Sequence, residues 1–458
     1  MPGSTAKWQI MNSSGSTLLN DITVVIFTYE RHCFLKRKLA FLSETGLKTL
    51  IADGSSSNYD GPLPDNVRYF HLPELNVYQR LTFLANHVDT KYVLPSADDD
   101  FVFLPTLEQG ASFLEQNPDF NSVQGSCFVF QQYFSKSSVQ FFEVGRYARE
   151  FSLVDEDPAL RLKTHFGNYM HNFYALQRSC VWREFYKEFN PYLMPHSSYY
   201  QYKPAMGEFC HSFALVSFGK HKVLSEPWML RENMPKFDVV TVDYEEAVEN
   251  LDKDYLGILA DFVVALETYR DPAFDWKSLT KERLRDFIKF GAGLVPKTPN
   301  MAFGDLETLL AEQPFSQSII LAFHDCHQLI TSHSEAVYAW MIQNCDPLES
   351  LYGRGWREDM KRRFKILVET MDNYVLFGAG EHTKALHEIG ALDERLVAIA
   401  DNNSKIWGTN LLEKPCIQPD RLLAYSANVI ISSKQHIAEI QAQLATCFGA
   451  RVNVYTLY

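Results

Sequence analysis

Residues 21–100 alternate short apolar runs with amphipathic segments, and this alternation constrains the fold more than any other feature of the chain. Four runs are rich in β-branched and aromatic residues, as buried strands are; they are residues 21–29, 47–56, 66–73 and 91–100. Residues 31–46 and 77–88 instead place apolar residues at helical spacing, and Gly46 is a typical helix stop. Strands and helices that alternate in this way build a mostly parallel sheet with helices on both faces.

The later segments divide the chain further. Residues 104–118 have helical spacing, and residues 120–147 contain strand-like runs. Helical periodicity dominates from 241 to 370, after which a strand, a glycine turn and a helix restart an α/β pattern. We therefore expect four parts; they are a flexible leader (1–20), an α/β domain (21–240), a helical segment (241–370) and a small α/β module (371–458).

The overall charge and the cysteine pattern argue against several classes of protein. A formal net charge of −13 argues against nucleic-acid binding, which needs a basic surface. The eight cysteines form no CxxC pair, as expected for free thiols in a reducing compartment. No window offers about 18 uninterrupted apolar residues, and residues 1–20 lack the apolar core of a signal peptide. We expect a cytoplasmic protein without a transmembrane segment, with peripheral attachment to the inner membrane left open.

Three consecutive aspartates, Asp98 to Asp100, follow the last of the four predicted strands. In an open parallel sheet ligands bind at the carboxyl ends of the strands, and two other strand ends carry polar residues, at 28–31 and 53–56. Because side chains alternate along a strand, we expect Asp98 and Asp100 to point the same way. Two carboxylates on one side suit Mg²⁺ or Mn²⁺ and leave coordination positions open for diphosphate oxygens. The alternative is a solvated acidic turn.

The segments ITVVIFTYERHCFLKRKLAFLS, TLIADGSS and YVLPSADDDF, in this order and spacing, resemble the family-2-like glycosyltransferases with the GT-A fold. The resemblance covers about residues 20–235 and implies that Asp98 and Asp100 are the metal ligands of an Asp-x-Asp motif. It also implies a set of donor-binding residues, in which Asp53 contacts the nucleotide base; they are Thr28, Glu30, Arg31, Asp53, Arg80 and Asp99. For Arg80, an arginine on a helix surface is an equal alternative.

The chain departs from the family pattern at two positions. Ala52 stands where an aspartate is usual, and the common Asp-Ala-Asp-Asp pattern reads Ser96-Ala97-Asp98-Asp99. The motif can therefore also be in register with Asp98 and Asp99. Which two of the three aspartates hold the metal stays open.

An inverting glycosyl transfer needs a base that takes the proton of the acceptor hydroxyl. In the similar enzymes this base is an acidic residue near the start of a helix, about a hundred residues beyond the Asp-x-Asp motif. Glu208 follows Gly207 and opens an apolar helix, so we expect it to be the base; an ordinary first-turn glutamate is the alternative. His211 lies on the same helix face as Glu208, and it is either a ligand contact or a structural histidine. Arg231 is expected to close over the diphosphate.

The segment VLFGAGEHTKAL has the glycine turn of a nucleotide-binding α/β domain. Gly378 and Gly380 would let the backbone approach a phosphate at a helix N-terminus. Asp401 lies where a ribose-binding acid is expected, although Thr383 replaces the third glycine of the motif. The segment resembles small Rossmann-like modules attached to sugar-modifying enzymes. This implies either a second nucleotide site or a scaffold for a partner or a homo-oligomer.

The resemblance implies a metal-dependent inverting glycosyltransferase of bacterial polysaccharide or glycolipid assembly. The implied cofactor is Mn²⁺ or Mg²⁺, the donor a nucleotide-diphospho sugar, first of all a UDP-sugar, and the acceptor a saccharide or glycolipid. Two alternatives stay open. A sugar-phosphate nucleotidyltransferase usually has a glycine-rich loop after the first strand, and residues 28–31 contain no glycine. A non-catalytic protein would bind a nucleotide or nucleotide sugar through the C-terminal module.

Overall fold

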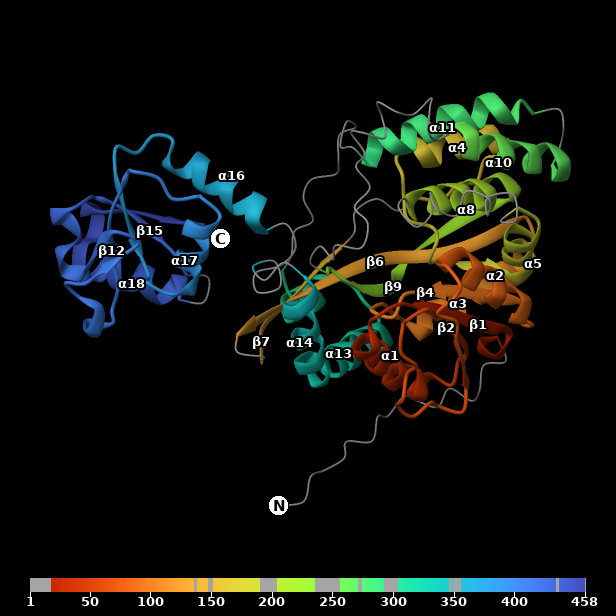
Figure 1. Ribbon diagram of the computed structural model, residues 1–458, viewed down its shortest axis with the longest axis horizontal. Coiled ribbons are helices and arrows are strands. Elements are labelled where there is room, and N and C mark those ends of the chain that lie inside the picture. The colour runs from red at the N-terminus through yellow and green to blue at the C-terminus, as the bar shows by residue number, and fades with distance from the viewer. Residues whose placement is uncertain are drawn as a thin grey trace, which may run out of the picture. The chain divides into compact units, whose positions relative to one another are not determined.

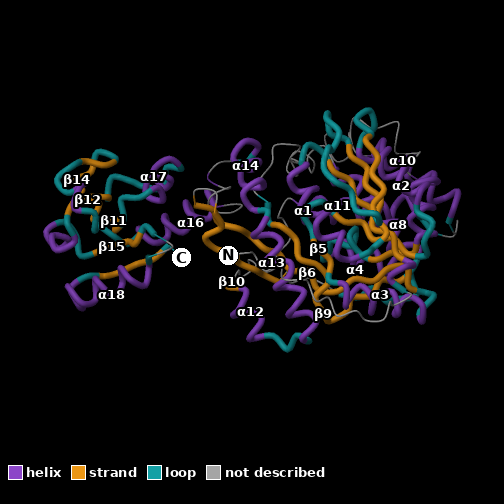
Figure 2. The backbone as a smooth tube through the Cα atoms, turned by 90° about the horizontal axis from the view of Figure 1, so that it is seen from below, coloured by secondary structure: helices purple, strands orange, loops and turns teal. Residues whose placement is uncertain are grey.

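The computed structural model forms two compact units, Met1–Asn344 and Cys345–Tyr458, and each is described by itself (Figures 1 and 2). The described residues are 18–135, 138–146, 151–189, 204–234, 256–270, 274–291, 304–345, 348, 356–433 and 436–457. The expected leader at 1–20 therefore lies almost entirely outside them.

Four parallel strands form one half of the sheet in the first unit. In the order β4-β1-β2-β3 they are β4 (Tyr92–Ser96), β1 (Ile22–Thr28), β2 (Lys48–Asp53) and β3 (Val67–His71). These strands confirm the four predicted runs, and the predicted helices are α1 (His32–Thr45) and α2 (Val77–His87). α1 ends where Gly46 takes a left-handed conformation (φ 64°), which glycine adopts without steric cost.

The other half of the sheet is mixed rather than parallel. β8 (Leu176–Arg178) runs antiparallel to both β4 and β6 (Phe120–Ser135). β7 (Ser138–Arg146) pairs antiparallel with β6 and with β10 (Gly304–Asp305). β9 (Lys220–Glu232) runs parallel to β6 and antiparallel to β5 (Phe101–Val102), the short strand directly after the three aspartates. Because β5 follows β4 in the chain, this pairing places the end of β9 next to the segment that contains the three aspartates.

Helices cover both faces of this sheet (Figure 1). On one face α1 and α3 (Leu104–Gln116) pack against Ile22, Val24 and Ile26 of β1. On the other face α2 packs with Val25. The further helices there are α4 (Pro158–Gly167), α5 (Ser179–Glu184), the π-helix Phe185–Phe189 and α8 (Pro204–Phe218). Alternate residues of β1 thus enter opposite cores, as in a strand buried on both sides.

The helices between residues 256 and 368 do not form the separate segment that we expected. α10 (Leu256–Tyr269) and α11 (Trp276–Gly291) bury apolar side chains in the core that also holds α2 and α8. α13 (Gln317–Ser332) packs against β5 and β6, next to α12 (Leu306–Glu312) and α14 (Ser334–Asn344). α16 (Trp356–Val368) instead belongs to the second unit. The three-domain layout is therefore not confirmed, because these apolar faces complete two α/β cores. The expected boundary at 240 lies outside the described residues.

The second unit is a smaller sheet with its first strand near the middle. In the order β13-β14-β12-β11-β15-β16, the strands are Asn410–Leu411, Lys414–Ile417, Leu396–Ala400, Tyr374–Phe377, Asn428–Ile431 and Asn453–Thr456. All pairs are parallel except β13 with β14. α16 and α17 (Glu381–Glu388) pack on one face and α18 (Ile437–Phe448) on the other. A sheet that grows outward on both sides of its first strand is doubly wound.

Short 3-10 turns complete the two units; they are Leu19–Asp21, Ser404–Ile406, Pro419–Ala424 and Gly449–Arg451. All eight cysteines are free thiols. Within the described ranges, no helix is long and apolar enough to cross a membrane.

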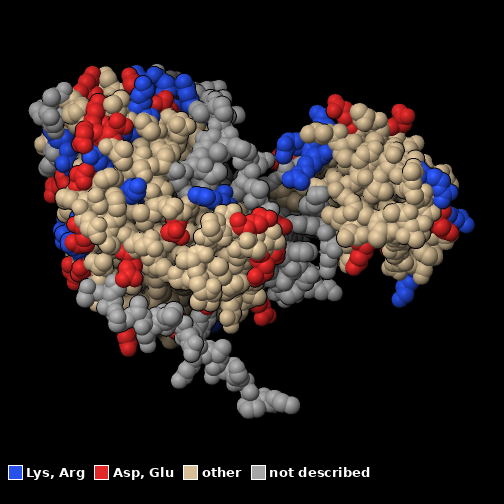
Figure 3. Space-filling model, turned by 180° about the vertical axis from the view of Figure 1, so that it is seen from behind, with Lys and Arg blue, Asp and Glu red and all other residues tan. Residues whose placement is uncertain are grey.

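Buried charged side chains distinguish one part of the first unit. On the face drawn in Figure 3, Lys and Arg side chains are interspersed with Asp and Glu at the surface. By contrast, Arg37, Lys38 and Asp53 have no exposed surface at all. Buried charges are costly unless they are paired, so their partners identify the region of interest.

Candidate functional site

The carboxyl ends of β1, β2 and β4 meet at one edge of the first sheet. Thr28 is the register partner of Asp53, and Ile26 is the partner of Ser96. The hydroxyl of Thr28 donates a 2.5 Å hydrogen bond to Asp98 Oδ2. The polar strand ends that the sequence predicts to converge are therefore in contact.

The three aspartates lie beyond the strand, in a turn. β4 ends at Ser96, and Asp98 and Asp99 occupy the turn before β5. The strand alternation from which we expected Asp98 and Asp100 to point the same way therefore does not apply. A single nitrogen, Arg31 Nη2, lies 3.0 Å from Asp98 Oδ1 and 2.5 Å from Asp99 Oδ2. Asp98 and Asp99 thus direct oxygens to a common point.

Asp100 has different neighbours. Its Oδ2 is buried without a hydrogen-bond partner, 3.4 Å from Nε of Arg231. Lys38 donates one hydrogen bond to the backbone carbonyl of Asp100 and another, 2.8 Å long, to the hydroxyl of Ser96. Burial raises the pKa of Asp100 to about 6 against the opposing charge of Arg231, and burial lowers the pKa of Lys38 to about 8.

Acidic and basic side chains balance in this region, because Arg37 also pairs with Glu232. We define the aspartate cluster as Asp98, Asp99, Asp100 and Glu232 with Arg31, Arg37, Lys38 and Arg231. Burial raises the pKa of Asp98, and the charge of Arg31 only partly opposes it. Burial also raises the pKa of Asp99, but Arg31, Arg231 and Arg37 together outweigh burial and hold this pKa below its ordinary value. Protein cations therefore hold the adjacent carboxylates together.

Asp53, at the end of β2, is held in one orientation. The backbone amide of Ser55 donates to its Oδ1 (2.8 Å), and the hydroxyl of Tyr69 donates to Oδ2 (2.7 Å). Nε2 of His32 lies 2.8 Å from the same Oδ2. Burial raises the pKa of Asp53, but these hydrogen bonds outweigh it and leave the pKa below its ordinary value. Asp53 is therefore a fixed acceptor at the edge of the site.

The turn between β1 and α1 contains an unusual backbone conformation. Glu30 has a φ of 54°, which is uncommon for a residue with a side chain. Its amide donates to Ser55 Oγ (2.7 Å), and its Oε1 accepts from the amide of Ser56 (2.7 Å). The indole of Trp340, on α14, donates to its carbonyl (2.8 Å). Contacts from the turn after β2 and from α14 thus impose this conformation next to Arg31.

Arg80 is buried and does not lie on a helix surface. Its Nη1 donates a 2.5 Å hydrogen bond to the carbonyl of Thr28. A Cβ atom on Gly54 would lie 2.3 Å from the same nitrogen. Glycine at 54 is therefore what lets the guanidinium pack beside the end of β2. Burial lowers the pKa of Arg80, and the charge of Asp53 opposes this.

Glu208 lies in the second turn of α8, because the helix begins at Pro204 and not at Glu208 as we expected. The hydroxyl of Tyr169 donates to its Oε1 (2.5 Å), and Nδ1 of His171 lies 2.7 Å from the same oxygen. The side chain is 31% exposed. Burial raises the pKa of Glu208, but His171 and Tyr169 outweigh burial and lower it to about 2. Glu208 is thus an ionised carboxylate with solvent access.

Arg231 pairs with Asp100 of the aspartate cluster, at 3.4 Å between Nε and Oδ2. Its guanidinium lies over the ring of Tyr174, 4.4 Å from the centroid. The positive charge of Arg231 acts on Asp100 and also lowers the pKa of Glu208.

His211 is enclosed in the core. It is 2% exposed, and its ring nitrogens lie 3.1 Å from the hydroxyl of Tyr186 and 3.1 Å from Oε1 of Gln177. Burial lowers its pKa to about 3. These contacts favour the structural alternative for His211.

The sequence did not single out four residues of the site, namely Arg37, Lys38, Tyr169 and His171. Arg37 and Lys38 could have been noticed in the sequence. They lie among apolar residues of α1, and α1 packs on a sheet that is buried on both faces. Tyr169 and His171 follow α4 in a segment without a motif, so only the fold shows that they meet Glu208.

The donor set of the aspartate cluster fits a hard divalent cation. Carboxylate oxygens are the protein ligands that Mg²⁺ and Mn²⁺ prefer, and Asp100 Oδ2 is a buried oxygen without a hydrogen bond. In the part of the chain that the structure describes, no group of three or more His, Cys, Asp and Glu side chains is arranged to hold a metal. A divalent cation at this site would therefore be held by two carboxylates, and oxygens of a bound ligand would complete its coordination.

The glycine turn of the second unit lies at the carboxyl end of β11. Gly378 has a φ of 119°, and Gly380 caps α17. Asp401 accepts hydrogen bonds from the backbone amides of Ala379 and Asn403, each with a length of 2.7 Å. The structure thus places Gly378, Gly380 and Asp401 together, with both oxygens of Asp401 bonded to backbone amides.

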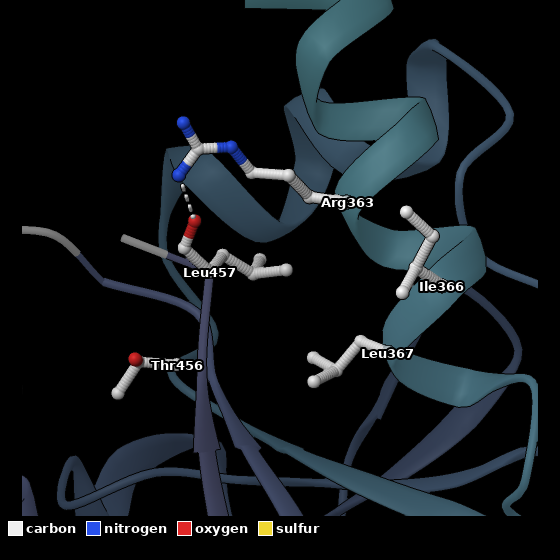
Figure 4. Close-up of a pocket in the computed structure, with 5 residues that line it drawn as sticks. All are labelled: Arg363, Ile366, Leu367, Thr456 and Leu457. Carbon is white, nitrogen blue, oxygen red and sulfur yellow. Dashed lines mark hydrogen bonds between the residues drawn. The ribbon is translucent and has the colours of Figure 1, made fainter. Parts of the chain in front are cut away.

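A pocket of about 360 Å³ lies elsewhere in the second unit, between α16 and β16 (Figure 4). Its lining is mostly apolar and is formed by Arg363, Ile366, Leu367, Thr456 and Leu457. Arg363 Nη1 donates to the carbonyl of Leu457 (3.0 Å). The pocket contains no carboxylate that could serve the chemistry of the aspartate cluster.

Comparisons with known proteins identify no family. No family model and no curated protein matches the chain. The chain is similar to the solved structure of S. aureus TarS, with 15% identity and a TM-score of 0.28, over 55% of this chain and 44% of TarS. It therefore spans less than half of that protein.

Two structures of S. aureus TarS 1–349 match over 70% of this chain and 91% of theirs. One has 14% identity and a TM-score of 0.29, and the other, in complex with UDP-GlcNAc, has 15% identity and a TM-score of 0.29. Such loose superpositions do not transfer an activity, so we base the function on the site itself.

Proposed function

We propose that the chain is a metal-dependent inverting glycosyltransferase that moves a sugar from a nucleotide-diphospho sugar to a hydroxyl acceptor. The observation that supports this most is the meeting of polar strand ends, where Thr28 lies beside Asp53 and donates to Asp98. Glu208 comes from a distant helix, and we assign it to the same site because the charge of Arg231, which pairs with Asp100, also acts on its carboxylate. The proposed setting is bacterial polysaccharide or glycolipid assembly, and UDP-sugars are the first donors to test.

The donor side of the site has groups for each part of a nucleotide-diphospho sugar. Asp53, with its fixed acceptor oxygens, would bind the base. Arg31 and Arg231 are suited to the diphosphate, because guanidinium groups match phosphate oxygens in charge and geometry. Asp98 with Asp99 or Asp100 would hold Mn²⁺ or Mg²⁺. When bound, the metal stabilises negative charge on the leaving diphosphate.

Glu208 is the proposed base. As the acceptor oxygen bonds to the anomeric carbon, the bond from that carbon to the diphosphate breaks and its electron pair stays on the diphosphate. The acceptor proton passes to the Glu208 carboxylate. Tyr169 and His171 both bond to Oε1, so they orient the carboxylate, and Oε2 would take the acceptor proton. Attack opposite to the leaving group inverts the anomeric centre.

Ser96, one of the two departures from the family pattern, has a role in this site. Its hydroxyl accepts from Lys38, which also binds the carbonyl of Asp100. The serine therefore helps to bury a cation beside the aspartates. Ala52, the other departure, packs in the core that holds α2 and α8.

Release of nucleoside diphosphate from a panel of nucleotide sugars with saccharide acceptors tests the proposal. We expect Mn²⁺-dependent turnover that falls about 10²-fold or more in Asp98→Asn and in Glu208→Gln. Asp89→Asn is the matched control, because Asp89 is an exposed carboxylate paired with Lys48. Full activity in Asp98→Asn would contradict the metal site, and nucleotide binding without turnover of any donor would favour the non-catalytic alternative.

A further inference from the structure

We propose that the guanidinium of Arg31 occupies the cation position of the aspartate cluster until the donor arrives, so that a divalent cation and a nucleoside diphosphate must displace it together. This inference rests on the proposed function and concerns how that site is loaded. It follows from the geometry of Arg31, from the charge balance and from the surroundings of its side chain.

Arg31 and a metal would need the same space. Its Nη2 lies 3.0 Å from Asp98 Oδ1 and 2.5 Å from Asp99 Oδ2. A Mg²⁺ ion bound to carboxylate oxygens sits about 2.0–2.1 Å from them, so it cannot bind these two oxygens while the nitrogen remains. A cation that binds Asp98 and Asp99 must therefore move the guanidinium.

The charge balance opposes binding of the metal alone. Four acidic side chains of the aspartate cluster are matched by four basic ones, and five of the eight residues are buried. A lone divalent cation would leave excess positive charge where charge is costly to bury. The diphosphate of a nucleotide brings compensating negative charge. Metal and nucleotide should therefore favour each other's binding, and by linkage the coupling is reciprocal.

The guanidinium of Arg31 already lies against two aromatic rings while it contacts the aspartates. Its Cζ lies 4.3 Å from the centroid of Phe34 and 5.9 Å from that of Trp340. Stacking on aromatic faces lets an arginine exchange one anionic partner for another without losing its support. Arg31 can thus turn from the aspartates to diphosphate oxygens, which it can bind through two nitrogens.

Binding of Mn²⁺ to the full-length protein, followed by the electron paramagnetic resonance signal of free Mn²⁺, tests the inference without any turnover. In the natural protein we expect UDP to strengthen Mn²⁺ binding about 10-fold or more. In Arg31→Gln we expect Mn²⁺ alone to bind about 10-fold tighter than in the natural protein, with a smaller effect of UDP. Arg68→Gln is the matched control, because Arg68 is an exposed arginine on β3 outside the cluster.

The outcomes separate this inference from the proposed function. Equal or weaker Mn²⁺ binding in Arg31→Gln, with binding lost in Asp98→Asn, would overturn the inference and keep the metal site. Absence of Mn²⁺ binding in every protein, with UDP still bound, would overturn both the inference and the metal dependence. Should Arg31→Gln fail to fold, Arg31→Lys serves instead. Its ammonium cannot stack as a guanidinium does, so we expect intermediate Mn²⁺ affinity, and unchanged affinity would count against the inference.

Discussion

At the scale of single residues, Gly54 determines how Arg80 reaches the donor site. We expect Gly54→Ala to displace the guanidinium from the carbonyl of Thr28, because the new Cβ would lie 2.3 Å from Nη1. The expected result is about 10-fold weaker UDP binding and a loss of about 1–3 kcal/mol in stability, measured by calorimetric titration and denaturant unfolding. Gly167→Ala is the control, since nothing lies within 4 Å of its Cβ position. Natural UDP affinity in Gly54→Ala would contradict this role.

The sequence predicted the acidic residues of the site better than the basic ones. Asp53 ends a buried strand and Asp98 follows one, which is a local pattern that can be seen without the fold. Lys38 reaches Asp100 from a helix that is 62 residues earlier in the chain. Arg37 reaches Glu232 over 195 residues. Such pairings depend on which face of α1 is buried and on the pairing of β9, which comes much later in the chain, with β5 and β6. Local spacing in the sequence shows neither.

At the scale of elements, α14 supports the turn that contains Glu30 and Arg31. We expect Trp340→Phe to keep the aromatic contact with Phe34 but to lose the hydrogen bond to the carbonyl of Glu30. Stability should fall by about 1 kcal/mol, and UDP should bind more weakly because Glu30 loses one of its constraints. Trp407→Phe removes a similar indole hydrogen bond, to Asp401, in the second unit and should leave UDP binding unchanged. Equal effects of both variants on UDP binding would argue against the role of α14.

Three buried histidines make the first unit sensitive to acid. Burial lowers the pKa of His165 on α4, His211 on α8 and His221 on β9 to about 3 each. Between pH 3 and the ordinary value of about 6.5 the unfolded chain binds protons that the native protein does not. The stability they contribute is therefore complete above about pH 6.5 and is lost as the pH falls toward 3.

His165→Phe tests this acid sensitivity, because neither ring nitrogen of His165 has a hydrogen-bond partner in the described structure. Each histidine should contribute a slope of about 1.4 kcal/mol per pH unit below pH 6. We expect denaturant unfolding of His165→Phe between pH 4.5 and 7 to show a slope smaller by about that amount. An unchanged slope would mean that His165 takes up a proton in the native protein.

At the scale of the whole molecule, the chain contains two compact units, each with apolar cores of its own. The sheet of the second unit is covered on one face by α16 and α17 and on the other by α18. We expect residues 345–458 to fold alone, with one cooperative calorimetric transition. Residues 1–344 should fold alone as well and, under the proposed function, should bind UDP. A fragment 345–458 without a transition would show that its core needs the first unit.

The α/β character of both units could be predicted from the sequence, because strand and helix periodicities differ over short windows. The place of the helices between 256 and 368 could not. Their apolar faces are equally compatible with a helical bundle and with a layer on a sheet, and only tertiary packing distinguishes the two. The mixed half of the sheet was missed because β8, β9 and β10 pair with strands far away in the chain.

The most direct test of the central claim is a thermal-shift measurement with nucleotides and nucleotide sugars, with and without Mn²⁺. A ligand that binds only the folded protein raises the melting temperature by mass action. We expect one nucleoside diphosphate or its sugar to raise the melting temperature only with Mn²⁺, and we expect Asp98→Ala to abolish this shift. A shift that needs no metal, survives Asp98→Ala and disappears in Gly380→Val would contradict the claim and place the nucleotide in the second unit.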